Sequence, residues 1–165
     1  MADEEWLIIR KRLGFTLVEL IVVIIILTIL SLYAASRYIG VGSFSALAIQ
    51  DSVISVARQV QLNRMQSNIV EFDVVGNNDG FVLSISANCI GSVEGCANPD
   101  GRSDWVADDK VSFSTSPNLS IVMFDLLGSP QGAAANGVEI TIHGSNSQAL
   151  VHLCANGLIS KSGCL

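Results

Sequence analysis

The segment RKRLGFTLVELIVVIIILTIL, residues 10–30, leads into an apolar run over residues 15–35. The single charged side chain in this run is Glu19. At about 1.5 Å per residue, positions 15–35 reach roughly 31 Å, which is one hydrocarbon thickness of a bilayer. The sequence therefore predicts a membrane-spanning helix over residues 15–35. A carboxylate inside such a helix costs on the order of 2.5–3.5 kcal/mol, so Glu19 needs a physical reason.

Three basic residues, Arg10, Lys11 and Arg12, lie directly before this run. The positive-inside rule then holds the N-terminus in the cytoplasm and predicts that the remaining chain lies outside. A cleaved secretory signal is the alternative, but its apolar core would be 7–15 residues long. Here the run is longer, and Ala34-Ala35-Ser36 is only a weak cleavage site. A retained single-pass anchor is the better prediction.

The stretch KRLGFTLVELIVVIIILTIL resembles the N-terminus of type IV pilins and of the pseudopilins of type II secretion systems. The resemblance implies that a prepilin peptidase removes a basic leader, residues 1–14, by cutting after Gly14 and then methylates the amine of Phe15. It also implies a bacterial inner-membrane location with a periplasmic C-terminal domain. The implied partners are the peptidase, an inner-membrane assembly platform, and other subunits of a pilus or pseudopilus filament.

The resemblance supplies a reason for Glu19, which becomes the fifth residue after cleavage. It lies about 6 Å along the helix from Phe15. Helices packed with an axial offset bring the amine of one Phe15 to the Glu19 of a neighbour. Such a pair at 4 Å is worth about 4 kcal/mol at an effective dielectric of 20, and burial costs a similar amount. The pair therefore sets register more than it adds stability; the alternative is a lone acid reaching toward water near a helix end.

Residues 36–66 are predicted to continue the anchor as an amphipathic helix, with the helical pattern clear from Ser43 to Met65. Many members of this family have a proline where this chain has Ser36. Secretion pseudopilins and accessory subunits often lack it, so its absence favours either of these over a major pilin. The apolar stripe, expected to lie on a sheet, comprises Ala46, Ile49, Val53, Val56, Ala57 and Val60. The opposite face comprises Ser45, Ser52, Ser55, Gln59 and Asn63.

Residues 67–165 show about seven short strand patterns separated by turn signals. IVEFDVV and FVLSISA, joined by GNNDG, indicate a hairpin, whereas residues 88–110 are predicted to be a loop. The remaining strands are VSFS, LSIVMFD, GVEITIH, QALVHLC and LIS, with turns at LGSPQG and at Asn156-Gly157. The predicted fold is α+β and pilin-like: a long N-terminal helix packed on antiparallel sheet.

The order of these C-terminal elements, MFDLLGSPQG, then VEITIH, then ALVHLCANGLIS, resembles the GspH/FimT branch of the pilin superfamily. The tail CANGLISKSGCL resembles accessory pilins of the mannose-sensitive haemagglutinin (MSHA) pilus. Two functions follow from the resemblance. The first is a minor pilin of an MSHA-type pilus that helps to initiate or cap the filament. The second is a GspH-like minor pseudopilin of a type II secretion system. A membrane-anchored enzyme or binding protein is disfavoured for want of a site.

Four cysteines, Cys89, Cys96, Cys154 and Cys164, form two close pairs after the apolar run. Neither spacing is the C-x2-C of a zinc ribbon or a redox motif. If the body is exported, Cys89–Cys96 and Cys154–Cys164 are expected disulfides, each worth about 2–3 kcal/mol. Four free thiols in a cytosolic protein remain the alternative.

No arrangement of residues in the sequence indicates catalysis, a cofactor or a metal site. His143 and His152 lie in predicted strands with no acid at metal-ligand spacing. Asp108 and Asp109, with the neighbouring acids Asp100 and Asp104, lack calcium-loop spacing, so a solvated acidic loop is expected. The net charge of −6, with Lys161 alone in the tail, argues against binding to nucleic acid.

Overall fold

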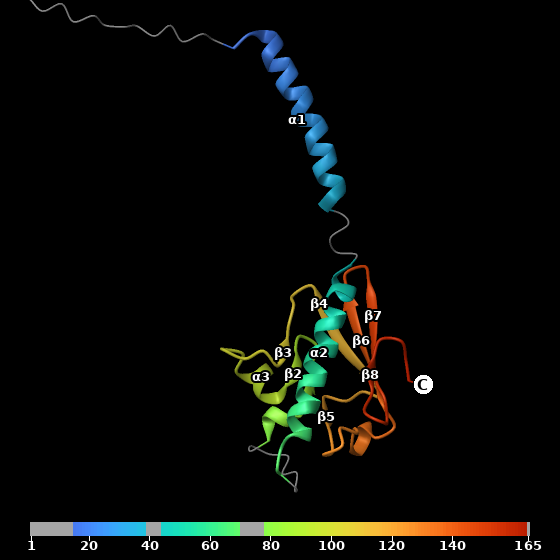
Figure 1. Ribbon diagram of the computed structural model, residues 1–165. Coiled ribbons are helices and arrows are strands. Elements are labelled where there is room, and N and C mark those ends of the chain that lie inside the picture. Colours follow the sequence, from blue (N-terminus) through green and yellow to red (C-terminus); the bar gives the residue numbers. More distant parts are fainter. Residues whose placement is uncertain (1–14, 39–43, 70–77, 165) are drawn as a thin grey trace, which may run out of the picture. The chain divides into compact units, whose positions relative to one another are not determined.

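The computed structural model describes residues 15–38, 44–69 and 78–164, and it comprises an N-terminal helical unit and a separate body (Figure 1). The first unit is the helix α1, Leu17–Tyr38. It extends three residues past Ala35, the predicted end of the membrane span, into the segment predicted as amphipathic helix, since Ser36 keeps the backbone N–H that a proline would lack. Of the predicted amphipathic helix over 36–66, residues 36–38 belong to α1 and residues 45–65 form α2, whereas residues 39–43 lie outside the described residues.

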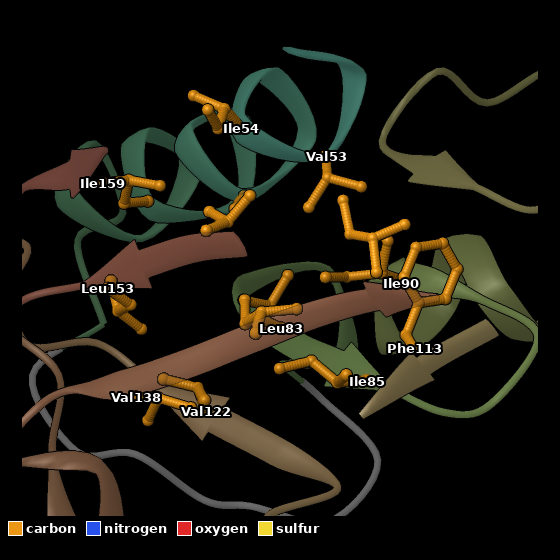
Figure 2. Packing of buried hydrophobic residues seen from close by; sticks show 14 of the residues in the cluster. Val53, Ile54, Leu83, Ile85, Ile90, Phe113, Val122, Val138, Leu153 and Ile159 are labelled. Carbon is orange, nitrogen blue, oxygen red and sulfur yellow. The ribbon is translucent and has the colours of Figure 1, made fainter. Parts of the chain in front are cut away.

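The body is organised around α2, Ser45–Met65, which packs against strands of both sheets. The predicted apolar stripe is confirmed: its members are buried except for Ile49, which is half-buried against the core. Ile54 and Arg64 are buried as well. Figure 2 shows Val53 projecting from α2 toward Ile90 and Phe113, two strand residues of the core.

Within the described residues, α2 packs against two four-stranded antiparallel sheets. The first has the order β3-β2-β1-β5, with β1 at Val82–Ile85, β2 at Ile90–Ser92, β3 at Trp105–Val106 and β5 at Ile121–Met123. The second has the order β4-β6-β7-β8, with β4 at Val111–Ser116, β6 at Val138–Gly144, β7 at Gln148–Leu153 and β8 at Ile159–Ser160. The α+β, pilin-like fold predicted from the sequence is confirmed.

The second sheet has an apolar face and a polar face. Ile140 of β6 pairs with Val151 of β7, and both side chains are fully buried. The neighbouring pair, Glu139 and His152, is partly exposed. This alternation is what the period of two in GVEITIH and QALVHLC predicts.

The prediction of a loop over residues 88–110 is wrong. The segment contains β2, the short helix α3 at Val93–Ala97 and β3. Gly91 permits this, because a Cβ atom there would lie 2.5 Å from the carbonyl oxygen of Asp104. Ser92 ends the strand and caps α3, since its hydroxyl accepts the backbone N–H of Gly95 at 2.8 Å. Isolated Gly and Ser residues resemble turn signals in sequence, which explains the error.

The predicted hairpin between IVEFDVV and FVLSISA cannot be compared as a unit, because residues 70–77 lie outside the described residues. The second half forms β1, whose partners are β2 and β5. Two smaller helical turns, η2 at Asp79–Phe81 and η3 at Gly132–Ala134, complete the body. Within the described residues the strands number eight against about seven predicted.

Candidate functional site

Glu19 lies in the first turn of α1, where hydrogen bonds to Thr16 fix the backbone. Its backbone N–H donates to the Thr16 hydroxyl at 3.2 Å, and Leu20 N–H donates to the Thr16 carbonyl at 3.1 Å. Thr16 therefore caps the helix, and the Thr-x-x-Glu spacing is that of a capping box. A carboxylate in the first turn also interacts favourably with the positive end of the helix dipole, by about 0.3–1 kcal/mol. This offsets part of the cost of placing Glu19 in an apolar segment.

Apart from Glu19, α1 is apolar on every side from Leu17 to Ala34. Leu17–Ala34 has a mean hydropathy of 2.8, and none of this window is buried. Its polar side chains are satisfied within the helix: the Thr28 hydroxyl donates to the Ile25 carbonyl and the Ser31 hydroxyl to the Leu27 carbonyl, both at 2.7 Å. Among the described residues this is the helix long and apolar enough to cross a bilayer. A helix that is apolar all round needs lipid or other apolar helices as its surroundings.

One known family model matches this segment. Residues 9–35 match the prokaryotic N-terminal methylation motif. This motif indicates a type IV pilin-like or pseudopilin-like protein, in which it implies prepilin processing and assembly with other pilin subunits. No curated protein and no solved structure matches the chain.

The predicted processing and assembly residues are all within the matched range. Gly14 lies outside the described residues, and Phe15 is the first residue described, with 82% of its surface exposed. Glu19 lies one turn further along the chain. The expected partner of Glu19 is the amine of a second subunit, so a single chain cannot bring the two groups together.

The body contains two short disulfide loops. Cys89 is bonded to Cys96, with Cα atoms 6.0 Å apart, and joins the chain before β2 to α3. Cys154 is bonded to Cys164, with Cα atoms 5.6 Å apart, and holds the C-terminal tail to the end of β7. Cys154 is 3% exposed, so the second bond is anchored in the core.

The prediction of a solvated acidic loop is wrong for Asp104, which is 4% exposed. Arg102 binds its carboxylate through two nitrogens, at 2.9 and 2.6 Å, and the hydroxyl of Ser92 donates to the same carboxylate. Burial alone would raise the pKa of Asp104, but the hydrogen bonds from Arg102 and Ser92 outweigh burial and lower it. The hydrogen bond to Asp104 raises the pKa of Arg102. The group is a structural ion pair beneath α3.

The two histidines lie on the outer face of the second sheet. His143 is exposed, and its Nε2 is 2.8 Å from the Ser114 hydroxyl. His152 Nδ1 is 3.7 Å from Glu139, its cross-strand neighbour. Sequence spacing did not reveal this acid, because 13 positions separate residues that strand pairing makes adjacent. In the ranges that the structure describes, no group of three His, Cys, Asp or Glu side chains could hold a metal ion.

Gln61 and Arg64, two polar side chains that the sequence did not predict to be functional, hold the end of α2 in place. Gln61 Nε2 donates to the carbonyls of Gly128 and Gly157, each at 2.7 Å, and so joins two turns. Arg64, 3% exposed, donates to the Phe124 carbonyl at 3.1 Å. No local sequence signal marks these contacts, since their partners are about 60–100 positions away.

Proposed function

We propose that this chain is a minor pilin of an MSHA-type type IV pilus, which assembles through its N-terminal helix and helps to initiate or cap the filament. The observation that carries the proposal is the methylation motif on residues 9–35 of a chain whose first helix, α1, exposes apolar side chains on all sides. Pilin-like proteins with this motif are structural subunits, so the proposed role is assembly and not catalysis.

In the proposed life cycle, the prepilin peptidase removes residues 1–14 by cutting after Gly14 and methylates Phe15. Residues 15–35 then anchor the subunit in the inner membrane, with the amphipathic helix and the β domain from residue 67 onward in the periplasm. The two disulfides support export, because such bonds persist in oxidising compartments. On assembly, α1 leaves the lipid and joins the apolar helices of neighbouring subunits.

Within the filament, Glu19 is proposed to pair with the methylated amine of Phe15 on the next subunit. Both groups lie at the start of α1, so an axial offset between parallel helices can bring one to the other. Leaving one charge of a desolvated pair without its partner costs about 3–5 kcal/mol. A mismatched register leaves these charges unpaired and carries the same cost. The pair therefore selects one axial register.

Two features support a minor MSHA-type subunit. The tail CANGLISKSGCL is tied back to β7 by Cys154–Cys164, and α1 continues through Ser36 where many major pilins have proline. The second candidate is a GspH-like minor pseudopilin of type II secretion. The GspH/FimT branch is favoured by the order of the C-terminal elements: β5, a turn at Gly128, β6, β7 and a turn at Gly157. Both glycines have a positive φ, 85° at Gly128 and 84° at Gly157, as such turns require.

The processing step is tested by replacing Gly14 with Leu and determining the N-terminus by mass spectrometry. The unaltered protein should begin with N-methylphenylalanine at position 15, and Gly14→Leu should retain the leader. Leu13→Ala is the matched control and should be processed normally. A Gly14→Leu protein of normal mature mass would contradict the assignment.

The assembly role of Glu19 is tested by Glu19→Gln, which preserves size and removes the charge. Membrane insertion should be normal and filament incorporation lost. Thr16→Val is the control, because it removes the helix cap that Glu19 N–H uses while leaving the carboxylate. If Glu19→Gln is incorporated into filaments as well as Thr16→Val is, the charge of Glu19 has no role in assembly beyond starting the helix.

Deleting the gene that encodes this protein distinguishes between the two proposed functions. Loss of surface pili with normal secretion of exoproteins supports the pilus, and the reverse supports the secretion system. Both phenotypes can be measured in one strain, by electron microscopy of the cell surface and by enzyme activity in the culture medium.

A further inference from the structure

A cleft lies where β3 and the loop after it meet the β1–β2 turn and the start of β4. It has a volume of about 530 Å³ and is lined by Asn88, Trp105, Ala107, Asp108, Asp109 and Val111. The β1–β2 turn, the strand β3 and the following loop thus meet around one indole ring. None of these residues takes part in the proposed assembly through α1.

Trp105 is positioned on the wall of this cleft by its neighbours in the chain. Asp104 is buried and Val106 packs against the core, so alternation along β3 places the side chain of Trp105 on the opposite, outer face. The indole N–H donates to the Pro99 carbonyl at 3.2 Å, which fixes the ring and occupies its single donor. What the ring offers to a ligand is therefore its π face.

The polar groups around the ring are predominantly acidic. Asp109 is exposed, and its carboxylate has no ion-pair or hydrogen-bond partner within the described residues, nor does the Asn88 amide. Asp108 accepts the backbone N–H of Lys110 at 2.8 Å, and this bond holds the loop that carries Asp109. With Lys110 included, residues 108–110 retain a charge of −1, on a body whose net charge is also negative. A π face beside carboxylates attracts cations.

The backbone of β3 adds a second, independent feature. Within the described residues, β3 is the edge strand of its sheet, and its one partner there is β2. Ser92 N–H donates to the Asp104 carbonyl, so the alternation of an antiparallel ladder directs the N–H and C=O of Trp105 to the open side. An extended peptide can pair with such an edge and place a side chain in an adjacent pocket.

We propose that this cleft binds an extended segment of a partner protein through a lysine or arginine side chain. The cation lies against the indole face of Trp105 and beside the carboxylate of Asp109, and the segment's main chain pairs with the open edge at Trp105. Charge complementarity selects a basic segment over an acidic or neutral one.

The test uses the full-length protein in detergent micelles with Trp6→Phe, which leaves Trp105 as the single tryptophan. The probe is the acetylated and amidated peptide Ser-Val-Arg-Val-Ser, and its partner probe has citrulline, the neutral analogue, in place of arginine. The arginine peptide should change Trp105 fluorescence saturably, and the citrulline peptide should bind at least about fivefold more weakly. Equal affinity for the two peptides, or no saturable change, would overturn the proposal.

Two variants complete the design. Asp109→Asn should weaken binding of the arginine peptide about fivefold, whereas Asp100→Asn, which removes the same charge from an exposed position outside the cleft, should leave it unchanged. An equal loss in both variants would show general electrostatic attraction and contradict a site. A saturable response to calcium chloride alone that is lost in Asp109→Asn would also contradict the proposal, because it would assign the carboxylate to a metal ion.

Discussion

The ion pair between Arg102 and Asp104 provides the sharpest test of how the body is held together. Asp104→Asn preserves the shape of the side chain but removes its charge and one of its acceptor oxygens. The carboxylate accepts two hydrogen bonds from Arg102 and one from Ser92, whose hydroxyl also caps α3. The substitution therefore weakens both the loop that carries β3 and the start of α3.

The expected loss can be estimated from burial. A hydrogen bond to a charged group contributes about 1.5–3 kcal/mol, and an exposed ion pair about 0–1 kcal/mol. Asp104 has a side chain 5% exposed, but that of Arg102 is 34% exposed, so water partly screens the pair. We expect Asp104→Asn to lower the free energy of unfolding by about 2 kcal/mol, which corresponds to about 4–8 °C in melting temperature for a chain of this size.

The measurement is thermal and urea unfolding of the full-length protein in detergent, followed by circular dichroism. Asp100→Asn, at an exposed position of the same segment, is the control and should change stability by less than about 0.5 kcal/mol. A double-mutant cycle with Arg102→Gln should give a coupling energy different from zero. If Asp104→Asn unfolds like the unaltered protein, or the coupling is zero, the ion pair has no structural role.

The same pair predicts a pH dependence. The pKa of Asp104 is lower in the folded protein than in the unfolded chain, where it is about 3.9. Its contribution is therefore complete above about pH 4 and declines as pH falls through the folded-state pKa. The stability difference between the unaltered protein and Asp104→Asn should be constant from pH 5 to 7 and shrink below pH 4. A difference that does not change between pH 7 and pH 2 would refute this reasoning.

Three further predictions concern the packing of the body, each measured by urea unfolding in the same detergent. Leu83→Ala, at a fully buried position, should cost about 2–5 kcal/mol, while Leu127→Ala, at a position 82% exposed, should cost less than about 0.5 kcal/mol. Replacing both Cys154 and Cys164 with Ser should cost about 2–3 kcal/mol, because the tail is no longer closed into a short loop. Gln61→Leu should cost about 1–2 kcal/mol, because two turn carbonyls lose the donor between them; equal stability would show that water replaces it.

Local patterns were sufficient to predict much of this protein. The continuous apolar run ending at Ala35 predicted α1, and the 3.6-residue spacing from Ala46 to Val60 predicted the buried face of α2. Alternation in GVEITIH and QALVHLC predicted β6 and β7. These signals are strong because each depends on one period in one segment, and burial follows directly from that period.

The connections between segments were decided by the tertiary structure. The 88–110 segment was predicted to be a loop, yet Gly91 lets β2 and β3 approach closely and Ser92 starts α3. Asp104 has the sequence features of a surface acid, but it is buried because Arg102 and Ser92 fold back onto it.

What the sequence determined by itself is the N-terminal apolar helix: the methylation motif and this helix depend only on consecutive residues, so no tertiary contact was needed to identify them. What only the tertiary structure decided is which distant polar groups meet. The pairing of His152 with Glu139, the clamp of Gln61 on two turns, and the cleft around Trp105 all follow from strand order and register. The physical reason is that a hydrogen bond or ion pair depends on a separation of a few ångströms in space, and chain folding sets that separation independently of distance along the sequence.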